Sequence, residues 1–298
     1  MELSILIPTY NDVCDSMVQE LARQAATIDG LTWEILVGDD GSTDEQVIAA
    51  NQRIATLEHC FYLRKNQNIG RAAIRNYLAQ SAHYERLLFI DSDMSICRED
   101  FVSTYLHENT LPVYGGYEVR GERREKRGER KEMRGNLRYL YEKASERQHT
   151  TKQRLRNPNR DFHTSNFMVL REQFLSHPLD ERLRHYGYED VLWGKQLAEA
   201  GIAIHHIDNP VVFDRFETNE EFVEKTETAL QTLNQFREEL SGYSRLLSLA
   251  DTLRRYHLTA LFRWLFRLNE KRWRRNLCGP SPSLHLFNIY KLGGLLNC

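Results

Sequence analysis

The first third of the chain alternates short apolar runs with amphipathic segments, and this alternation constrains the fold more than any other feature. The apolar runs are expected to be strands at residues 4–7, 33–38, 61–63 and 86–90. Apolar residues at helical spacing lie between them, at about 15–26, 44–57 and 70–81. Such alternation builds a mostly parallel sheet with helices on its faces. We therefore predict an α/β fold with a mostly parallel central sheet, whose ligands bind at the carboxyl ends of the strands.

The remaining elements are expected from local signals. Pro8 should end the first strand, and Ser42 or Thr43 should cap the second helix. Later in the chain we expect a strand at 165–170, a helix at 191–200 closed by Gly201, a strand at 202–204 and a long polar helix at 220–239. We assign residues 1–240 to a catalytic domain and 241–298 to a C-terminal amphipathic helical extension.

Size and composition are typical of a soluble globular protein. The 298 residues are 41% hydrophobic and 28% charged, which is ample for a sizeable core. The net charge of -2 gives no argument for nucleic-acid binding, and we expect no nucleic-acid partner. Five scattered cysteines without CxxC spacing are typical of reduced thiols. We find no leader pattern and no run of about 18 apolar residues, and we therefore expect a cytoplasmic protein.

Two carboxylates stand at the end of the fourth predicted strand, in Phe89-Ile90-Asp91-Ser92-Asp93. Alternate side chains of an extended segment share a face, so Asp91 and Asp93 can point to one place. Hard cations such as Mg²⁺ and Mn²⁺ take oxygen ligands of this kind, often together with substrate phosphates. The pattern indicates a metal site, although solvated carboxylates at a turn would look the same.

A second polar turn, Asp39-Asp40-Gly41-Ser42, follows the second predicted strand. A carboxylate at this position can accept a hydrogen bond from the N–H group of a nucleotide base. The same residue types also cap helices, so the turn alone fits both interpretations.

Taken in order, five segments resemble the bacterial family 2 glycosyltransferases with the GT-A fold, which invert the configuration of the transferred sugar. The first four segments are 5–11, 37–44, 68–76 and Asp91-Ser92-Asp93. The fifth combines 180–183, Gly187-Tyr188-Glu189-Asp190 and 197–201, and it is similar to the acceptor-side segment of that family. The resemblance covers about residues 3 to 217 and implies a single Rossmann-like nucleotide-binding domain.

The resemblance implies a role for each matching residue. The nucleotide sugar would contact Pro8, Thr9, Tyr10, Asp40, Asn68, Gly70, Arg71, Arg75, Asp91 and Ser92. Asp40 would meet a uracil-type base, Asp91 would serve the ribose and the metal, and Asp93 would be the more direct ligand of Mn²⁺ or Mg²⁺. Asp190 would deprotonate the acceptor hydroxyl, with Glu189 beside it to position the acceptor.

The sequence departs from the family pattern at the third metal ligand. Many relatives have a histidine near the segment 209–212, whereas this chain has Phe213 and Asp214 there and His206 upstream. Asp214 or His206 could therefore complete the metal shell, or water and diphosphate could fill it.

Two basic segments are compatible with more than one role. Residues 120–160 are dense in Arg, Lys and Glu, and we expect a mobile loop that passes into a helix at about 136–147. This segment could be solvated, could bind an acidic acceptor or could close over the donor diphosphate. The tail at 243–298 mixes aromatic residues with arginines, which suits either contact with the inner face of the cell membrane or packing on the catalytic domain.

The sequence therefore predicts a metal-dependent inverting glycosyltransferase that moves a sugar from a nucleotide sugar to a glycan or lipid-linked acceptor in cell-surface polysaccharide synthesis. UDP is the favoured nucleotide. Two alternatives stay open at this point. One is a nucleotidyltransferase that makes sugar nucleotides, although the chain lacks a Gly-rich phosphate loop after its first strand. The other is a catalytically degenerate nucleotide-sugar-binding module.

Overall fold

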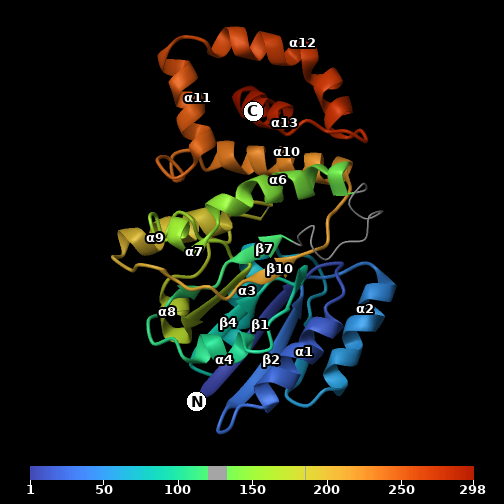
Figure 1. Ribbon diagram of the computed structural model, residues 1–298, viewed down its shortest axis with the longest axis vertical. Coiled ribbons are helices and arrows are strands. Elements are labelled where there is room, and N and C mark those ends of the chain that lie inside the picture. Colours follow the sequence, from blue (N-terminus) through green and yellow to red (C-terminus); the bar gives the residue numbers. More distant parts are fainter. Residues whose placement is uncertain (120–132, 185) are drawn as a thin grey trace. The chain divides into compact units, whose positions relative to one another are not determined.

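A seven-stranded mixed sheet forms the core of the computed structural model, which describes residues 1–119, 133–184 and 186–298 (Figure 1). In spatial order its strands are β3 (Cys60–Arg64), β2 (Thr32–Asp39), β1 (Glu2–Thr9), β4 (Arg86–Ile90), β8 (Asn166–Leu170), β6 (Val113–Tyr114) and β9 (His205–His206). The strands β3, β2, β1 and β4 run parallel, and β8 is antiparallel to both β4 and β6. The predicted α/β class with a mostly parallel sheet is confirmed.

The register of the sheet brings the carboxyl ends of the parallel strands to one edge. Thr9 of β1 pairs with Asp39 of β2, which in turn pairs with Arg64 of β3. On the other side Ile90 of β4 faces Asn166, the first residue of antiparallel β8. The turns after β1, β2 and β4 and the segment before β8 therefore share this edge.

The first strand is longer than predicted, because β1 continues through Pro8 to Thr9. Pro8 pairs with Gly38 of β2, whereas the pairing of β1 with β4 reaches only Leu6 and Phe89. At Pro8 the strand thus has one neighbour, and proline is tolerated where a strand has an open side.

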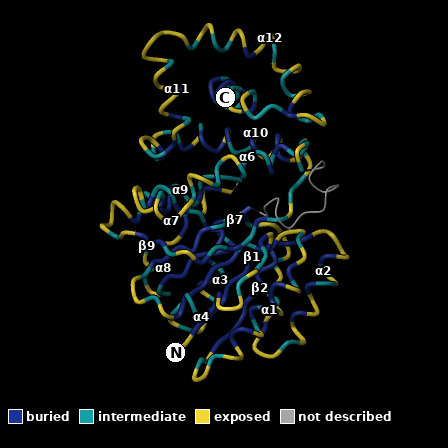
Figure 2. The backbone as a smooth tube through the Cα atoms, in the orientation of Figure 1, coloured by how far each residue is buried: buried dark blue, intermediate teal, exposed yellow. Residues whose placement is uncertain are grey.

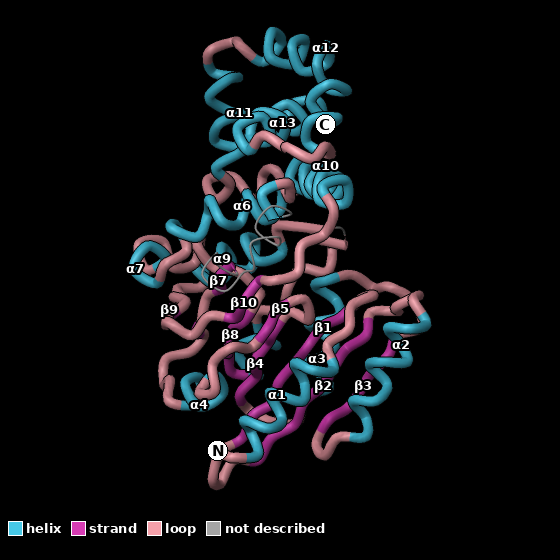
Figure 3. The backbone as a smooth tube through the Cα atoms, turned by 45° about the vertical axis from the view of Figure 1, so that its right-hand side comes forward, coloured by secondary structure: helices cyan, strands magenta, loops and turns pink. Residues whose placement is uncertain are grey.

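Helices cover both faces of this sheet and bury its apolar side chains (Figures 2 and 3). They are α1 (Asp15–Ala26), α2 (Glu45–Gln52), α3 (Arg71–Ser81), α4 (Phe101–Leu106), α7 (Thr151–Arg154), α8 (Arg171–Ser176) and α9 (Glu189–Glu199), with a 3-10 turn at Arg53–Thr56. The helices expected at 15–26, 70–81 and 191–200 agree with α1, α3 and α9 to within two residues.

Two local predictions were wrong. Asp44, not Ser42 or Thr43, caps α2, because its carboxylate accepts hydrogen bonds from the N–H groups of Gln46 and Val47 at 2.8 and 3.3 Å. The strand expected at 202–204 begins at His205, where pairing with β6 becomes available.

A second sheet has three short strands in the order β5 (Met94–Ser95), β10 (Val211–Phe213) and β7 (Tyr117–Val119) (Figure 3). Strands β10 and β5 are antiparallel, with Phe213 opposite Met94 and Val212 opposite Ser95. This pairing brings the segment after residue 210 to the turn that follows β4.

The chain divides into two compact units. The first comprises 1–118, 148–184 and 193–215, and the second comprises 119–147, 185–192 and 216–298. The second unit is helical, with α6 (Leu137–Ser145), a 3-10 turn at Glu146–Gln148, α10 (Asn219–Gln235), α11 (Arg245–Arg255), α12 (Thr259–Leu277) and α13 (Leu284–Asn297). Helix α13 packs against α10, α11 and α12. The predicted boundary at 240 stays a prediction.

The basic segment expected to be a mobile loop lies partly outside the described residues, which resume at 133. From there to residue 160 the chain is mostly helical, and α6 begins after Asn136, whose side chain caps it by accepting from the N–H group of Tyr139 at 2.8 Å. None of the helices in the described ranges combines the length and the apolar character needed to cross a membrane.

Candidate functional site

The turns after β1 and β2 are joined by Asn11. Its side-chain oxygen accepts hydrogen bonds from the N–H groups of Thr43 and Asp44, at 2.8 and 3.0 Å, and its own N–H donates to the hydroxyl of Ser42 at 2.8 Å. Asn11 adopts a φ of 51°, a conformation that asparagine tolerates better than most residues. Next to it, Thr9 is buried and Tyr10 is 47% exposed. Two of the predicted nucleotide contacts thus line the start of an ordered loop.

Asp40 is buried and holds the segment that precedes α3. One carboxylate oxygen accepts from the N–H of Ile69 at 2.7 Å, and the other accepts from the N–H of Gly70 at 3.0 Å. Burial raises the pKa of Asp40, against the effect of these two hydrogen bonds. The carboxylate predicted to meet a base therefore has a structural role as well, and its contact with a base stays a prediction.

Backbone packing fixes this part of the edge further. Gly41 has a φ of 77°, and a Cβ atom at this position would lie 2.5 Å from the carbonyl carbon of Gln67. Gly70 has a φ of 100°, and its Cβ would lie 3.2 Å from the carbonyl oxygen of Arg184. Only glycine combines these conformations with such close approaches. Asn68 stands between these two contacts with its side chain exposed.

Asp91 carries a charge that two arginines compensate. The buried Arg75 donates a hydrogen bond to one of its carboxylate oxygens, and the guanidinium of Arg71 lies 3.7 Å from the other. Arg75 also donates to the carbonyl oxygen of Arg71 at 3.0 Å. Because the Arg71 side chain is 41% exposed, its part of this ion pair is the weaker one. Arg71 is thus the more exposed of the two arginines beside Asp91, and its contact with a nucleotide sugar stays a prediction.

Asp93 is exposed, and the short sheet brings Asp214 toward it. Phe213 lies opposite Met94, so Asp93, which precedes β5, and Asp214, which follows β10, leave the same end of this antiparallel pair. Asp214 accepts a hydrogen bond from the hydroxyl of Ser95 at 3.0 Å. Two carboxylates from segments far apart in the sequence thus approach the same turn.

Arg215, which no sequence pattern singled out, ties this turn to the loop after β1. Its guanidinium donates to the carbonyl oxygen of Ser92 at 2.6 Å and to the carboxylate of Asp12 at 2.8 Å. The only sequence signal was a basic residue directly after Asp214, which gains meaning once β10 is known to pair with β5.

His206 lies in the interior and both of its ring nitrogens have partners. Nδ1 is 3.1 Å from the guanidinium of Arg154, and Nε2 is 2.8 Å from the carbonyl oxygen of Pro158. Burial lowers the pKa of His206 to about 4. A neutral ring that donates to Pro158 and accepts from Arg154 has no lone pair left for a metal. Asp214 as the third ligand stays a prediction.

In the described ranges no three His, Cys, Asp or Glu side chains stand together as a preformed metal site. Asp91, Asp93 and Asp214 nevertheless offer only oxygen atoms, which is the donor type that Mg²⁺ and Mn²⁺ prefer. In such sites substrate phosphates and water supply the other ligands. The residues present therefore fit a metal that binds together with a diphosphate.

The predicted catalytic pair opens helix α9. Glu189 is buried, and Asp190, which is half-buried, accepts from the N–H of Val191 at 2.8 Å. Just before them, Gly187 and Tyr188 have φ values of 102° and 71°. Positive φ at a residue other than glycine costs about 1–3 kcal/mol and is most often retained at functional sites.

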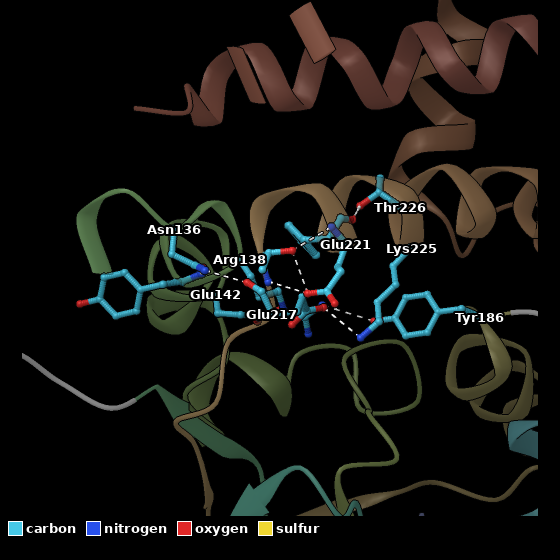
Figure 4. A network of polar contacts seen from close by, with 11 residues as sticks. Asn136, Arg138, Glu142, Tyr186, Glu217, Glu221, Lys225 and Thr226 are labelled. Carbon is cyan, nitrogen blue, oxygen red and sulfur yellow. Dashed lines mark hydrogen bonds and ion pairs between the residues drawn. The ribbon is translucent and has the colours of Figure 1, made fainter. Parts of the chain in front are cut away.

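A polar network holds the segment before this pair (Figure 4). Arg138 donates to the hydroxyl of Tyr186 at 3.3 Å and forms an ion pair with Glu142 at 2.9 Å. The carbonyl oxygen of Tyr186 accepts from the hydroxyl of Thr232 at 3.3 Å, and Lys225 contacts Glu217 at 3.1 Å in the same network. The turn that carries Asp190 is therefore fixed from α6 and α10.

Comparisons with known proteins agree with this geometry. The family model described as "Glycosyl transferase family 2" matches residues 4–177. A poly(ribitol-phosphate) beta-glucosyltransferase of Bacillus spizizenii is 33% identical over 108 residues, which are 35% of this chain and only 17% of that protein.

Two solved structures are similar over nearly the whole chain. The mannosyltransferase PcManGT from Pyrobaculum calidifontis, in complex with GDP-Man and Mn²⁺, is 14% identical with a TM-score of 0.56, over 98% of this chain and 86% of that one. TarS 1-349 from S. aureus, in complex with UDP-GlcNAc, is 15% identical with a TM-score of 0.51, over 99% and 90%. At this level of identity they show the fold, and they confirm the predicted GT-A type.

Proposed function

The chain belongs to glycosyl transferase family 2, and on this premise we propose that it transfers a sugar from a UDP-sugar, with inversion, to a hydroxyl group of a glycan or lipid-linked acceptor in cell-surface polysaccharide synthesis. The observation that carries the proposal is the polar edge of the sheet. There Asp40 follows β2 and Asp91 and Asp93 follow β4, two parallel strands on either side of β1, and Asp214 follows β10, which pairs with β5 just after Asp93. Because the chain belongs to a glycosyltransferase family, the alternative of a nucleotidyltransferase that makes sugar nucleotides is excluded.

The donor is the first part of the proposal. Arg71 and Arg75 would face the diphosphate, because they already stand beside Asp91 and one of them is half-exposed. Thr9, Tyr10 and Asp40 would line the nucleoside. UDP is the favoured nucleotide because Asp40 matches the family residue that meets a uracil-type base. S. aureus TarS, which shares the fold, was solved in complex with UDP-GlcNAc.

Asp93 and Asp214 would hold Mn²⁺ or Mg²⁺, with Asp91 next to them. The ion would stabilise the negative charge that develops on the departing diphosphate. PcManGT, which shares the fold, was solved with Mn²⁺. Ser95 orients Asp214, and Arg215 fixes the carbonyl oxygen of Ser92, so this chain itself sets the positions of the carboxylates.

Asp190 would remove the proton from the acceptor hydroxyl, and the neighbouring Glu189 would position the acceptor. Support comes from the strained backbone at Tyr188 and from the network that holds Tyr186, since both restrict where Asp190 can lie. General-base assistance of this kind is typically worth about 10²–10⁴ in rate.

A thermal-shift screen of nucleotide sugars with and without Mn²⁺ identifies the donor, because a tight ligand stabilises the folded state by mass action. Release of the nucleotide then measures transfer. We expect Asp190→Asn to lose about 10²–10⁴ in rate while its melting shift with the donor is unchanged. Glu199→Gln, at the exposed end of the same helix, is the matched control. Full transfer by a folded Asp190→Asn enzyme would reject the base, and no shift with any nucleotide sugar would favour a degenerate binding module.

The helical extension at 243–298 supports a peripheral position on the inner face of the cell membrane. Four apolar residues of α12 are exposed and follow helical spacing, so they form one apolar stripe: Leu261, Trp264, Leu265 and Leu268, which are 53, 58, 41 and 64% exposed. Arginines and lysines flank it, as in helices that lie in the interface of anionic membranes.

Sedimentation with lipid vesicles tests this contact. The intact chain should bind vesicles that contain phosphatidylserine more than vesicles of phosphatidylcholine alone, and Trp264→Ser/Leu268→Ser should lose that binding. Leu249→Ser, which removes an exposed leucine from α11, is the control. Equal sedimentation of the intact chain and the double variant would show that the stripe does not dock on lipid.

A further inference from the structure

We propose that residues 148–163, together with Tyr117, form a binding site for a phosphate-bearing acceptor, an inference that rests on the proposed function and specifies its acceptor. The site would take the negatively charged groups of a polyol-phosphate polymer or of a lipid diphosphate-linked sugar, rather than a neutral glycan. Every residue used in the argument belongs to the first compact unit.

The site lies beside the proposed metal-binding turn. The carbonyl oxygen of Ser165 accepts a hydrogen bond from the N–H of Asp91 at 3.0 Å. His163 stands two residues before Ser165, at the amino end of β8, and β8 runs antiparallel to β4. The segment that ends at His163 therefore reaches the same sheet edge as Asp91.

Three polar rings from separate segments meet there. The ring of His149 lies 5.1 Å from that of His163 and 5.1 Å from that of Tyr117, and the rings of Tyr117 and His163 are 5.8 Å apart. All three residues are half-buried. Imidazole and phenol groups offer hydrogen bonds to phosphate and hydroxyl oxygens, and their faces suit contact with a sugar or polyol chain.

A buried arginine lies behind these rings. Arg154 is 2% exposed, donates to the carbonyl oxygens of His149 and Ile207 at 2.9 and 3.0 Å, and has its guanidinium 4.8 Å from the centre of the Tyr114 ring. In the described part of the chain no carboxylate forms an ion pair with Arg154, although the charge of Asp208 acts on it electrostatically. The site thus has a positive charge at its back that carbonyl groups solvate without neutralising.

The exposed surface of the same segment is also positive. Residues 148–160 contain Lys152, Arg154, Arg156 and Arg160 and no aspartate or glutamate. Lys152 and Arg156 are exposed, and neither forms an ion pair within the described ranges. Asp161 is the nearest acidic residue in the sequence. Exposed cations without an ion pair, in the same segment as a buried arginine and His149, complement a ligand with several negative charges.

A donor-binding role for the same cations makes a different kinetic prediction, and the two are separable. Residues that bind the acceptor change its KM, whereas residues that close over the donor change the KM of the UDP-sugar. The variant Lys152→Ser/Arg156→Ser removes two exposed charges and leaves the rings and Arg154 in place. Arg53→Ser, which removes an exposed arginine from the 3-10 turn after α2, is the matched control.

Three probes are compared in binding and in transfer: a soluble polyol-phosphate polymer, a lipid diphosphate-linked sugar in detergent, and a neutral glycan. We expect at least one phosphate-bearing probe to bind, and Lys152→Ser/Arg156→Ser to weaken its binding and raise its KM by about tenfold, with the KM of the UDP-sugar unchanged. His163→Asn should also weaken the binding of that probe, whereas Arg53→Ser should leave its binding unchanged. Preference between the two phosphate-bearing probes identifies the source of the phosphate.

Binding is also measured with the full-length Asp190→Asn protein, which makes the test independent of catalysis. A phosphate-bearing probe that binds this protein and depends on Lys152 and Arg156 supports the site even if no transfer is found. Binding that the double variant leaves unchanged, or equal use of the neutral glycan, overturns the proposal while the proposed transferase activity can still stand.

Discussion

Replacing Asp40 by asparagine tests whether its buried carboxylate stabilises the fold by holding the segment before α3. In the folded protein its two oxygens accept the N–H groups of Ile69 and Gly70 at 2.7 and 3.0 Å. Asparagine keeps one acceptor and turns an amide N–H₂ toward the second N–H. The change removes one charge-assisted hydrogen bond, worth about 1.5–3 kcal/mol, and leaves a buried donor unsatisfied at about 1–3 kcal/mol.

Part of this loss is recovered, because burial raises the pKa of Asp40 and the charged form is therefore costly to bury. We expect a net loss of about 2–4 kcal/mol in the free energy of unfolding at neutral pH. Urea unfolding followed by circular dichroism measures it. The control is Asp44→Asn, which should change little, since asparagine caps a helix as well as aspartate does. A loss below about 1 kcal/mol, or one equal to the control, would refute the role assigned to Asp40.

Two further predictions concern Arg215, which no sequence pattern singled out, and His206, which the sequence suggested as a possible metal ligand. Arg215→Met should reduce kcat/KM by about 10–100-fold, because it frees the carbonyl oxygen of Ser92, and unchanged steady-state kinetics would contradict this. Burial lowers the pKa of His206 from 6.5 to about 4, so the stability it contributes is complete above about pH 6.5 and is lost as the pH falls toward 4. His206→Asn should flatten that part of the stability profile by up to about 3 kcal/mol, and an unchanged profile would show that His206 is not buried in the neutral form.

The sequence could predict what short-range patterns determine. Helix α1 begins at Asp15 and ends at Ala26 as expected, because its apolar residues follow helical spacing over the whole segment. The carboxyl-end positions of Asp40 and Asp91 followed from strand order alone, since parallel strands end at one edge.

The features that escaped prediction depend on contacts between distant segments. Nothing near Asp214 in the sequence indicates that it comes beside Asp93, and the hydrogen bond that orients it spans 119 residues, to Ser95. The same holds for Asn11, which joins two turns 31 to 33 residues apart. His206 looked like a candidate ligand until its partners Arg154 and Pro158 were known.

The central claim, that Asp93 holds a metal ion which binds together with the nucleotide, is tested most directly by isothermal titration calorimetry. The affinity for UDP is measured with and without Mn²⁺, for the unmodified chain and for Asp93→Asn. Asp100→Asn, an exposed carboxylate a few residues away that pairs with Arg98, is the control. We expect Mn²⁺ to strengthen UDP binding by the unmodified chain and by the control. In Asp93→Asn that gain should fall by about 10–100-fold. A variant that lacks the Asp93 carboxylate yet binds UDP with the full Mn²⁺-dependent gain would contradict the account.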